Sequence, residues 1–218
     1  MRAMIFLVLS GLSVILSGAG PGFAAALDVV RPVASCASLT GTDMVAIGSA
    51  GSEITAAEET TSDGIAVCSV TGTLAPEVNF QVLLPMERWT QRYLQVGCGG
   101  LCGNITLTSG ASTGCQVLND GGFVMAATDM GHSGYDGTWG LDAQKRADFA
   151  YRAQHLTAVA ARALIAAFYG QPEQFSYFNG CSDGGREGLM EAMRFPEDFD
   201  GVIAGAPAML FQVQNTLY

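Results

Sequence analysis

Apolar and polar residues alternate along several short stretches of the chain, and these stretches predict β-strands. Residues 79–84 (NFQVLL) alternate and end at Pro85, as a strand with one buried face would. Residues 92–96 (RYLQV) predict a second strand, which runs into a glycine-rich loop at 97–103. The run at 123–128 (FVMAAT) is almost wholly apolar, which is typical of a strand buried on both faces.

A helical period follows these strands. Between about residues 147 and 169, apolar side chains recur every three to four positions, and a glycine and a proline end the pattern. Residues 175–178 then predict a strand, 185–194 a helix stopped by a proline, and 201–204 the next strand. Strands that alternate with helices imply a mostly parallel sheet covered on both faces, so we predict an α/β fold.

The first 26 residues have the pattern of a secretory signal peptide. A positively charged start precedes an apolar run at 4–16, and a stretch of small residues ends in three alanines at Ala26. The apolar run is shorter than the roughly 20 residues that a membrane-spanning helix needs. We therefore expect cleavage near Ala26, a secreted or periplasmic location, and no membrane attachment of the mature chain.

The remaining chain divides at residue 79. Residues 27–78 are rich in Thr, Ser, Ala and Gly and contain short β-like runs such as 64–70 (GIAVCSV), so we expect a β-rich N-terminal segment there. Residues 79–218 carry the alternation of strands and helices. The mature chain is long enough for one compact domain with a core of its own.

The formal net charge of −10 limits the partners. Nothing in the sequence resembles a cluster of Lys and Arg residues that could neutralise phosphates, which argues against nucleic acid as a partner. No G-x-G-x-x-G opens a helix, which argues against a dinucleotide site. We therefore expect this chain to bind a small-molecule substrate and no cofactor.

Six cysteines in an exported chain indicate disulfides. The sequence alone does not choose among the pairings, although a Cys36–Cys68 bridge would tie down the N-terminal segment. A metal site built from Cys98, Cys102 and Cys115 is the alternative, but its spacing lacks the paired C-x2-C signature of zinc sites. The disulfide candidates are Cys36, Cys68, Cys98, Cys102, Cys115 and Cys181.

Two segments match the G-x-S-x-G pattern of a serine nucleophile, 180–184 (GCSDG) and 110–114 (GASTG). A nucleophile elbow needs a strand before the serine and a helix after it, because that sharp turn pushes the hydroxyl out above the sheet. Ser182 has both, so we predict that it is the nucleophile. Ser112 lies in a loop rich in Thr, Ser and Gly.

An ester-cleaving serine also needs N–H donors for the oxyanion. In elbow enzymes the residue after the nucleophile supplies one donor, which is Asp183 here, and a glycine-rich loop after an earlier strand supplies another. We expect that loop to be 97–103, with Gly100, or else Gly99, as the donor. The alternative is that its glycines serve only a tight, disulfide-linked turn.

Residues 180–208 (GCSDGGREGLMEAMRFPEDFDGVIAGAPA) closely resemble the nucleophile segment of the tannase and feruloyl esterase family. The resemblance covers about residue 79 to the end of the chain. Three earlier blocks are similar to this family in the same order: RYLQVGCGGLCG, GGFVMAATDMGHSG and DFAYRAQHLTAVAARALIAAFYG.

The resemblance implies an α/β-hydrolase fold and an exported serine esterase acting on esters of aromatic acids. Ser182 matches the family nucleophile, and Asp183 and a glycine of 97–103 match its oxyanion donors. Cys181 matches a cysteine that, in this family, bridges to a cysteine directly before the catalytic histidine. The family's lid, which often carries calcium, and its triad aspartate and histidine would lie beyond Tyr218.

No histidine follows Ser182, although the chain order of hydrolase triads places it there. We interpret His155, within the predicted helix, as a surface or structural group, and His132 as a residue outside the triad. We interpret Asp129 as a structural hydrogen-bonding group at a turn. Residues 79–218 would then be the N-terminal part of a catalytic domain, truncated after the strand that follows the elbow and inactive alone. The alternative is a non-catalytic exported binding module or an inactive fragment.

Overall fold

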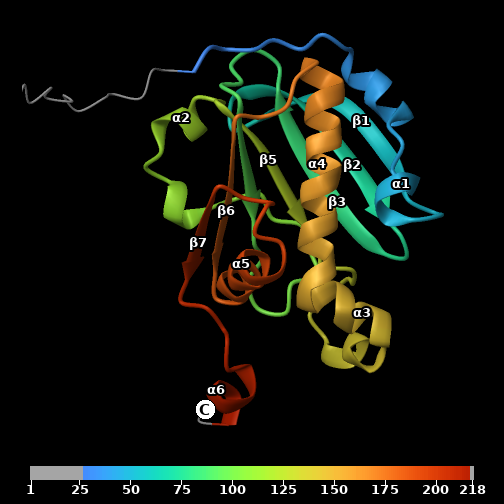
Figure 1. Cartoon of the computed structure of the whole chain (residues 1–218), viewed down its shortest axis with the longest axis vertical. Coiled ribbons are helices and arrows are strands. Elements are labelled where there is room, and N and C mark those ends of the chain that lie inside the picture. The colour runs from blue at the N-terminus through green and yellow to red at the C-terminus, as the bar shows by residue number, and fades with distance from the viewer. Residues whose placement is uncertain (1–26, 217–218) are drawn as a thin grey trace, which may run out of the picture.

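A seven-stranded sheet forms the centre of the computed structural model, which describes residues 27–216 (Figure 1). From one edge to the other, its strands follow the order β1-β2-β3-β5-β4-β6-β7. The strands are β1 (Glu53–Ser62), β2 (Ile65–Leu74), β3 (Val78–Pro85), β4 (Arg92–Val96), β5 (Phe123–Thr128), β6 (Phe175–Cys181) and β7 (Gly201–Gly205).

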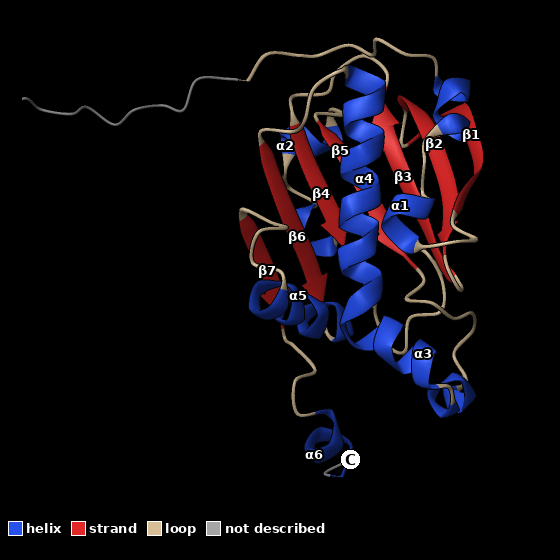
Figure 2. Ribbon diagram, turned by 45° about the vertical axis from the view of Figure 1, so that its right-hand side comes forward, coloured by secondary structure: helices blue, strands red, loops and turns tan. Residues whose placement is uncertain are grey.

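The sheet has an antiparallel half and a parallel half. The pairs β1–β2, β2–β3 and β3–β5 are antiparallel, whereas β5, β4, β6 and β7 run parallel to one another. The C-terminal ends of the parallel strands lie at the same end of the sheet, beside α5 (Asp183–Arg194) in Figure 2. The predicted α/β fold is confirmed, and the strands predicted at 92–96 and 123–128 are β4 and β5 to the residue.

The N-terminal segment adds two strands to this same sheet. β1 and β2 pair from Glu53↔Thr73 to Ser62↔Ile65, and β2 also pairs with β3. The sequence pattern did not indicate β1, because its residues (EITAAEETTS) are mostly polar and largely exposed at the edge of the sheet. Acidic side chains on an exposed edge also discourage pairing with the edge of another sheet.

One long helix, α4, lies across one face of the sheet (Figure 2). Its buried side chains, which include Leu164, Ile165 and Phe168, join those of the sheet in one apolar core. The α-helices are α1 (Val45–Gly48), α2 (Gln116–Asn119), α3 (Ala143–Ala147), α4 (Ala153–Tyr169), α5 and α6 (Phe211–Thr216), and the 3₁₀ helices are η1 (Cys36–Gly41), η2 (Gly110–Ser112) and η3 (Gly137–Leu141).

The helix predicted between about 147 and 169 is interrupted near its start. α3 runs into a π-helical turn, η4 (Asp148–Arg152), before α4 begins. Asp148 is fully buried there, and its Oδ1 accepts a hydrogen bond from Nη1 of Arg152 at 2.6 Å. The apolar pattern does not reveal such a turn, because a π turn changes the hydrogen-bond register and leaves the residue types unchanged. The end is as predicted, with Gly170 in a left-handed conformation (φ 70°).

A disulfide ties the N-terminal segment to the sheet. It joins Cys36 of η1 to Cys68 of β2, the bridge that the sequence favoured, and both residues are buried. Within residues 27–216, no helix is long and apolar enough to cross a membrane. The signal peptide predicted at 1–26 lies outside the described residues.

Candidate active site

Ser182 occupies the turn where β6 runs directly into α5 (Figure 1). Its backbone has φ 62° and ψ −117°, a conformation that L-residues rarely adopt. Strain of this kind persists only where the surroundings fix it, and a strand–turn–helix of this shape raises a serine hydroxyl above the sheet. The side chain of Ser182 is exposed. The predicted elbow geometry is therefore present at this residue.

Three glycines allow β6, α5 and β7 to approach one another around the elbow. A Cβ added to Gly180 would lie 2.3 Å from the carbonyl oxygen of Gly184, and one added to Gly185 would lie 2.3 Å from that of Gly205. A Cβ on Gly184 would lie 2.8 Å from the carbonyl oxygen of Cys98. Backbone contacts this short exclude a side chain, so packing requires both outer glycines of the 180–184 motif.

Hydrogen bonds fix the backbone of Ser182 on two sides. Its N–H donates to the carbonyl of Gly205 at 3.0 Å, and its carbonyl accepts from the N–H groups of Arg186 (3.2 Å) and Ala208 (3.0 Å). Asp183 is the first residue of α5, and N–H groups in the first turn of a helix have no partner within it. The helix dipole adds positive potential at the same point. The N–H of Asp183 is therefore placed to donate to a developing oxyanion.

The glycine-rich loop 97–103 lies beside the start of α5. The N–H of Gly184 donates to the carbonyl of Cys98 at 2.7 Å, which couples helix and loop. Gly99 and Gly100 are exposed, and a Cβ on either would meet nothing within 4 Å. Among the described residues, neither of these two N–H groups has an acceptor. The loop thus offers two free donors, and its contacts do not choose between them.

The side chain of Asp183 is buried in a bidentate ion pair. Its Oδ1 accepts from Nε of Arg186 at 2.7 Å, and its Oδ2 accepts from Nη2 at 2.9 Å. Arg186 also donates to the carbonyls of Phe149 (3.0 Å) and Ala150 (3.2 Å), and its guanidinium lies 4.4 Å from the centre of the Phe149 ring. With its carboxylate held in this way, Asp183 can serve the nucleophile only through its backbone.

His132 contacts the loop and not the serine. Its ring is 2% exposed and stacks on Trp139, with the ring centres 4.3 Å apart. Its Nε2 lies 2.7 Å from the carbonyl oxygen of Leu101, and because a carbonyl only accepts, Nε2 is the donor. Among the described residues, the hydroxyl of Ser182 has no hydrogen-bond partner. His132 therefore supports the loop 97–103, in agreement with its interpretation as a residue outside the triad.

His155 belongs to a separate polar cluster at the other end of α5. Its Nδ1 bonds to Oδ2 of Asp198 at 2.6 Å, and Arg162 donates to Oδ1 of the same carboxylate at 3.1 Å. Burial alone would raise the pKa of Asp198, but these two partners outweigh burial and lower the pKa. Glu191 joins the cluster. It lies roughly 13 Å along the helix axis from Ser182, at 1.5 Å per residue, which separates His155 from the nucleophile.

The buried carboxyl of Glu191 predicts a pH dependence of stability. Burial, with Asp198 beside it, raises the pKa of Glu191 from 4.5 to about 9 in the folded chain. The native state then keeps a proton that the unfolded chain has released, so the contribution of Glu191 to stability is complete below pH 4.5 and is lost as the pH rises through about 9. The slope for one proton is about 1.4 kcal/mol per pH unit.

We therefore expect Glu191→Gln to flatten the pH dependence of the free energy of unfolding across this range, as measured by denaturant titration at several pH values. Gln cannot ionise, so the slope of the variant should be shallower than that of the native chain. Glu197→Gln, at an exposed position nearby, should leave the slope unchanged. Parallel pH curves for the native chain and Glu191→Gln would contradict the prediction.

Asp129 has the structural role predicted for it. Its Oδ1 accepts hydrogen bonds from the N–H groups of Asn79 (3.0 Å) and Gly131 (2.9 Å), and its Oδ2 accepts from Nδ2 of Asn79 (2.7 Å). These bonds connect the end of β5 to β3. The donors to Asp129 all hold the backbone or a side chain in place, and none belongs to the elbow.

The remaining cysteines divide into one pair and two thiols. Cys98 and Cys102 form a disulfide within the loop 97–103. Neither sulfur is then a thiolate, the form in which cysteine binds a metal. Among the described residues, Cys115 (half-buried) and Cys181 (exposed) are free.

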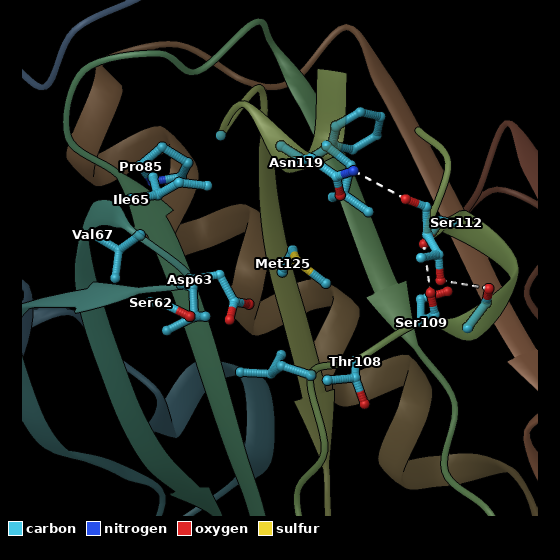
Figure 3. A pocket seen from close by; sticks show the side chains of 17 residues that line it. Ser62, Asp63, Ile65, Val67, Pro85, Thr108, Ser109, Ser112, Asn119 and Met125 are labelled. Atoms are coloured by element: carbon cyan, nitrogen blue, oxygen red, sulfur yellow. Dashed lines mark hydrogen bonds between the residues drawn. The ribbon is translucent and has the colours of Figure 1, made fainter. Parts of the chain in front are cut away.

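A cavity of about 470 Å³ lies away from the elbow (Figure 3). Ile65 and Val67 line one side of it, Ser109 and Ser112 line the other, and Met125 lies between them. The hydroxyl of Ser112 donates to the carbonyl of Ser109 at 3.1 Å. No residue lining this cavity comes from β6, α5 or the loop 97–103. Ser112 itself lies in the 3₁₀ turn η2, and no strand leads directly into that turn.

Sequence reasoning missed three buried polar side chains next to the loop: Gln95, Gln154 and Glu187. They are 0%, 1% and 2% exposed. Gln95 lies in the otherwise apolar end of β4, and Gln154 lies in the first turn of α4. The sequence feature that could have indicated them is a polar residue within an otherwise apolar strand or helix. Such residues are rarely fully buried without a hydrogen-bond partner.

Comparison with known proteins identifies the family. Residues 62–218 match the family model described as Tannase and feruloyl esterase. The chain is 41% identical over 138 residues to a probable feruloyl esterase B-2 of Aspergillus flavus, covering 62% of this chain and 25% of that protein. It is 36% identical over 160 residues to the mono(2-hydroxyethyl) terephthalate hydrolase of Piscinibacter sakaiensis, covering 64% of this chain and 26% of that protein.

A solved structure agrees with this result. Feruloyl esterase B from Aspergillus oryzae matches with a TM-score of 0.64 and 28% identity, over 80% of this chain and 38% of that chain. The chain spans about a quarter of the length of the two curated relatives named above. The family model covers the loop 97–103 and the elbow at Ser182, together with most of the chain. This chain belongs to the tannase and feruloyl esterase family.

Proposed function

We propose that this chain is the nucleophile-bearing part of an exported serine esterase that cleaves esters of aromatic acids. The observation that carries the proposal is the backbone of Ser182, held at φ 62° between β6 and α5 beside free N–H donors. Relatives that carry the names feruloyl esterase and mono(2-hydroxyethyl) terephthalate hydrolase favour an aromatic acyl group.

The proposed reaction proceeds through an acyl-enzyme. The Ser182 oxygen bonds to the ester carbonyl carbon while its proton passes to a base. The carbonyl oxygen becomes an oxyanion, which accepts hydrogen bonds from the N–H groups of Asp183 and of Gly100 or Gly99. The carbon–oxygen bond to the alcohol then breaks, and the alcohol leaves with the proton. Water attacks the acyl-serine in the same way and releases the aromatic acid.

The base is proposed to come from outside these 218 residues. His132 is bonded to the loop and His155 to Asp198, so neither is placed to take the proton of Ser182. Cys181 directly precedes the nucleophile and is exposed as a free thiol. We propose that it pairs with a cysteine next to that base, as the family resemblance implies, which would bring base and nucleophile together.

Export is proposed on two observations. The first 26 residues have the charge, apolar run and small-residue end of a signal peptide. Two disulfides are formed among residues 27–216, and disulfides persist in oxidising compartments. N-terminal sequencing of protein recovered from the periplasm or medium tests this. A mature chain starting after Ala26 supports export, and an intact Met1 in the cytoplasm contradicts it.

The activity is tested with the complete protein that contains this chain. We expect it to hydrolyse methyl ferulate or methyl gallate with a higher kcat/KM than methyl butyrate, which lacks the aromatic ring. A preference for methyl butyrate would contradict the aromatic acyl group. Saturable binding of methyl ferulate without turnover would contradict the esterase and support a binding module.

The contact between α5 and the loop predicts a large effect of Gly184→Ala. The added methyl group would lie 2.8 Å from the Cys98 carbonyl oxygen and 2.9 Å from the Gly97 carbonyl carbon, so helix and loop must separate. We expect kcat of the complete esterase to fall by about 10²–10³-fold, as when an oxyanion donor is lost. The expected loss of stability is about 1–3 kcal/mol, as for other overpacked sites.

Gly114→Ala is the matched control, because Gly114 ends the other G-x-S-x-G match and a Cβ there meets nothing within 4 Å. It should leave kcat unchanged. Steady-state kinetics and thermal unfolding of the two variants compare them directly. Equal activity of Gly184→Ala and Gly114→Ala would contradict the proposed role of the loop.

A further inference from the structure

A chain of buried hydrogen bonds leads from the centre of the sheet to the loop 97–103. The hydroxyl of Tyr93 donates to Oε1 of Gln95, and Nε2 of Gln95 donates to Oε1 of Gln154. Nε2 of Gln154 in turn donates to Oε2 of Glu187 at 2.5 Å. The four side chains come from β4, α4 and α5, and none is more than 2% exposed.

Tyr93 sets the donor-to-acceptor direction of this series of hydrogen bonds. Burial raises the pKa of Tyr93 well above its usual value, so the hydroxyl keeps its proton and donates. Each glutamine amide has one accepting and one donating end, and therefore passes the direction on. Oε2 of Glu187 is then an acceptor, and it also accepts from the N–H of Cys98 at 3.3 Å.

The other oxygen of Glu187 faces the disulfide. Oε1 lies 2.7 Å from Sγ of Cys98 and 3.4 Å from Sγ of Cys102. Disulfide sulfurs carry no hydrogen and can only accept, so a hydrogen bond between Oε1 and Sγ of Cys98 needs its proton on the carboxyl group. Arg186, the neighbouring cation, is already paired with Asp183. Burial, and then the charge of Asp183, raise the pKa of Glu187 well above its ordinary value, which agrees with an uncharged acid.

We propose that Glu187 is the positioning residue of the loop 97–103, and that its uncharged carboxyl group holds Cys98 by both its N–H and its sulfur. Held in this way, Cys98 fixes the two residues that follow it, Gly99 and Gly100, with their N–H groups free. This inference rests on the proposed function, in which those N–H groups receive the oxyanion.

Glu187 is one of several groups that bind the loop 97–103. The Cys98 carbonyl is held by the N–H of Gly184 at 2.7 Å, and the Leu101 carbonyl by His132 at 2.7 Å. Glu187 contacts both the N–H and the sulfur of Cys98. Removal of the carboxyl group would leave a buried N–H without a partner, which favours opening of the loop.

The test uses the loop disulfide as a reporter and needs no catalysis. The 218-residue chain is treated with dithiothreitol, the free thiols are alkylated at intervals, and mass spectrometry follows the two disulfides separately. The buried Cys36–Cys68 bridge is an internal reference for general unfolding in each sample. The measured quantity is the reduction rate of Cys98–Cys102 divided by that of Cys36–Cys68.

Three variants at position 187 separate positioning from bulk. Gln keeps one donor and one acceptor in the same shape, Asp withdraws the carboxyl group by one carbon, and Leu removes both hydrogen-bonding functions. We expect Glu187→Gln to stay within about twofold of the native rate ratio, and Glu187→Asp and Glu187→Leu to raise it about tenfold, the factor expected from one lost buried hydrogen bond. If Glu187→Leu unfolds the chain, the rate ratio of Glu187→Asp decides the outcome.

Glu191→Leu is the matched control, because Glu191 is a buried glutamate on the same helix with no contact to the loop. It should not change the rate ratio. Unchanged ratios for both Asp and Leu at position 187 would overturn the proposal, and so would a Gln variant as fast as the Leu variant.

Activity provides the second readout. In the complete esterase, Glu187→Asp should lower kcat with little change in KM, and Glu187→Gln should restore kcat. If the complete protein cleaves no aromatic ester, the proposed function fails. The disulfide rate ratios would still decide whether Glu187 holds the loop.

Discussion

Ser182→Ala should lower kcat of the complete esterase on methyl ferulate by about 10⁴–10⁶-fold, the loss that accompanies removal of a serine nucleophile. The exposed hydroxyl of Ser182 makes no hydrogen bond within residues 27–216, so its removal should leave the fold intact. The substitution should therefore abolish turnover without a comparable change in thermal stability. Binding of the ester should persist, because the N–H donors of the loop 97–103 are unaltered.

Ser112→Ala is the control that the sequence itself provides. Ser112 stands in the same G-x-S-x-G pattern, but its hydroxyl is bonded to the carbonyl of Ser109 and lines the cavity of Figure 3. We expect it to retain full activity. Comparable losses from the two serine variants, measured by initial rates on methyl ferulate, would contradict the assignment of Ser182.

The second large effect concerns the 218-residue chain by itself. We expect it to hydrolyse methyl ferulate at least about 10⁴-fold more slowly than the complete esterase, because a serine without its base loses most of its reactivity. The oxyanion donors alone would account for the residual rate. The two proteins are compared in the same assay at equal concentration.

The gene offers an independent check on this second prediction. Sequencing of the encoding DNA past the codon for Tyr218 should reveal an in-frame continuation with an aspartate and a Cys-His dipeptide. Normal turnover by the 218-residue chain would contradict the prediction directly. A stop codon at that point, together with turnover, would require a base among residues that the structure places elsewhere.

Much of the fold could be predicted from residue patterns. The runs at 92–96 and 123–128 are β4 and β5 without a change of boundary. The run at 123–128 is almost wholly apolar, as buried parallel strands are. β1 could not be predicted, because an exposed edge strand gains its stability from backbone pairing and needs no apolar side chains. The π turn at Asp148–Arg152 was missed because such a turn changes the hydrogen-bond register and leaves the residue types unchanged.

The site was predictable where local geometry determines it. A strand, a small–Ser–small turn and a helix are all visible in the sequence, and the strained φ of Ser182 follows from them. The partners of the loop were not predictable. His132 and Glu187 reach 97–103 from distant segments, and only the folded sheet brings them together. The sequence identified a glycine-rich loop with cysteines, but not the side chains that hold it.

The central claim is that Ser182 carries the acyl group during turnover. The most direct test is to mix the complete protein with methyl ferulate, quench it in acid within one turnover, and map the modified peptide by mass spectrometry. The account predicts a feruloyl group on the peptide containing Ser182 and none on Ser112 or any cysteine. Turnover without an acylated peptide, or a feruloyl group on another residue, would contradict it.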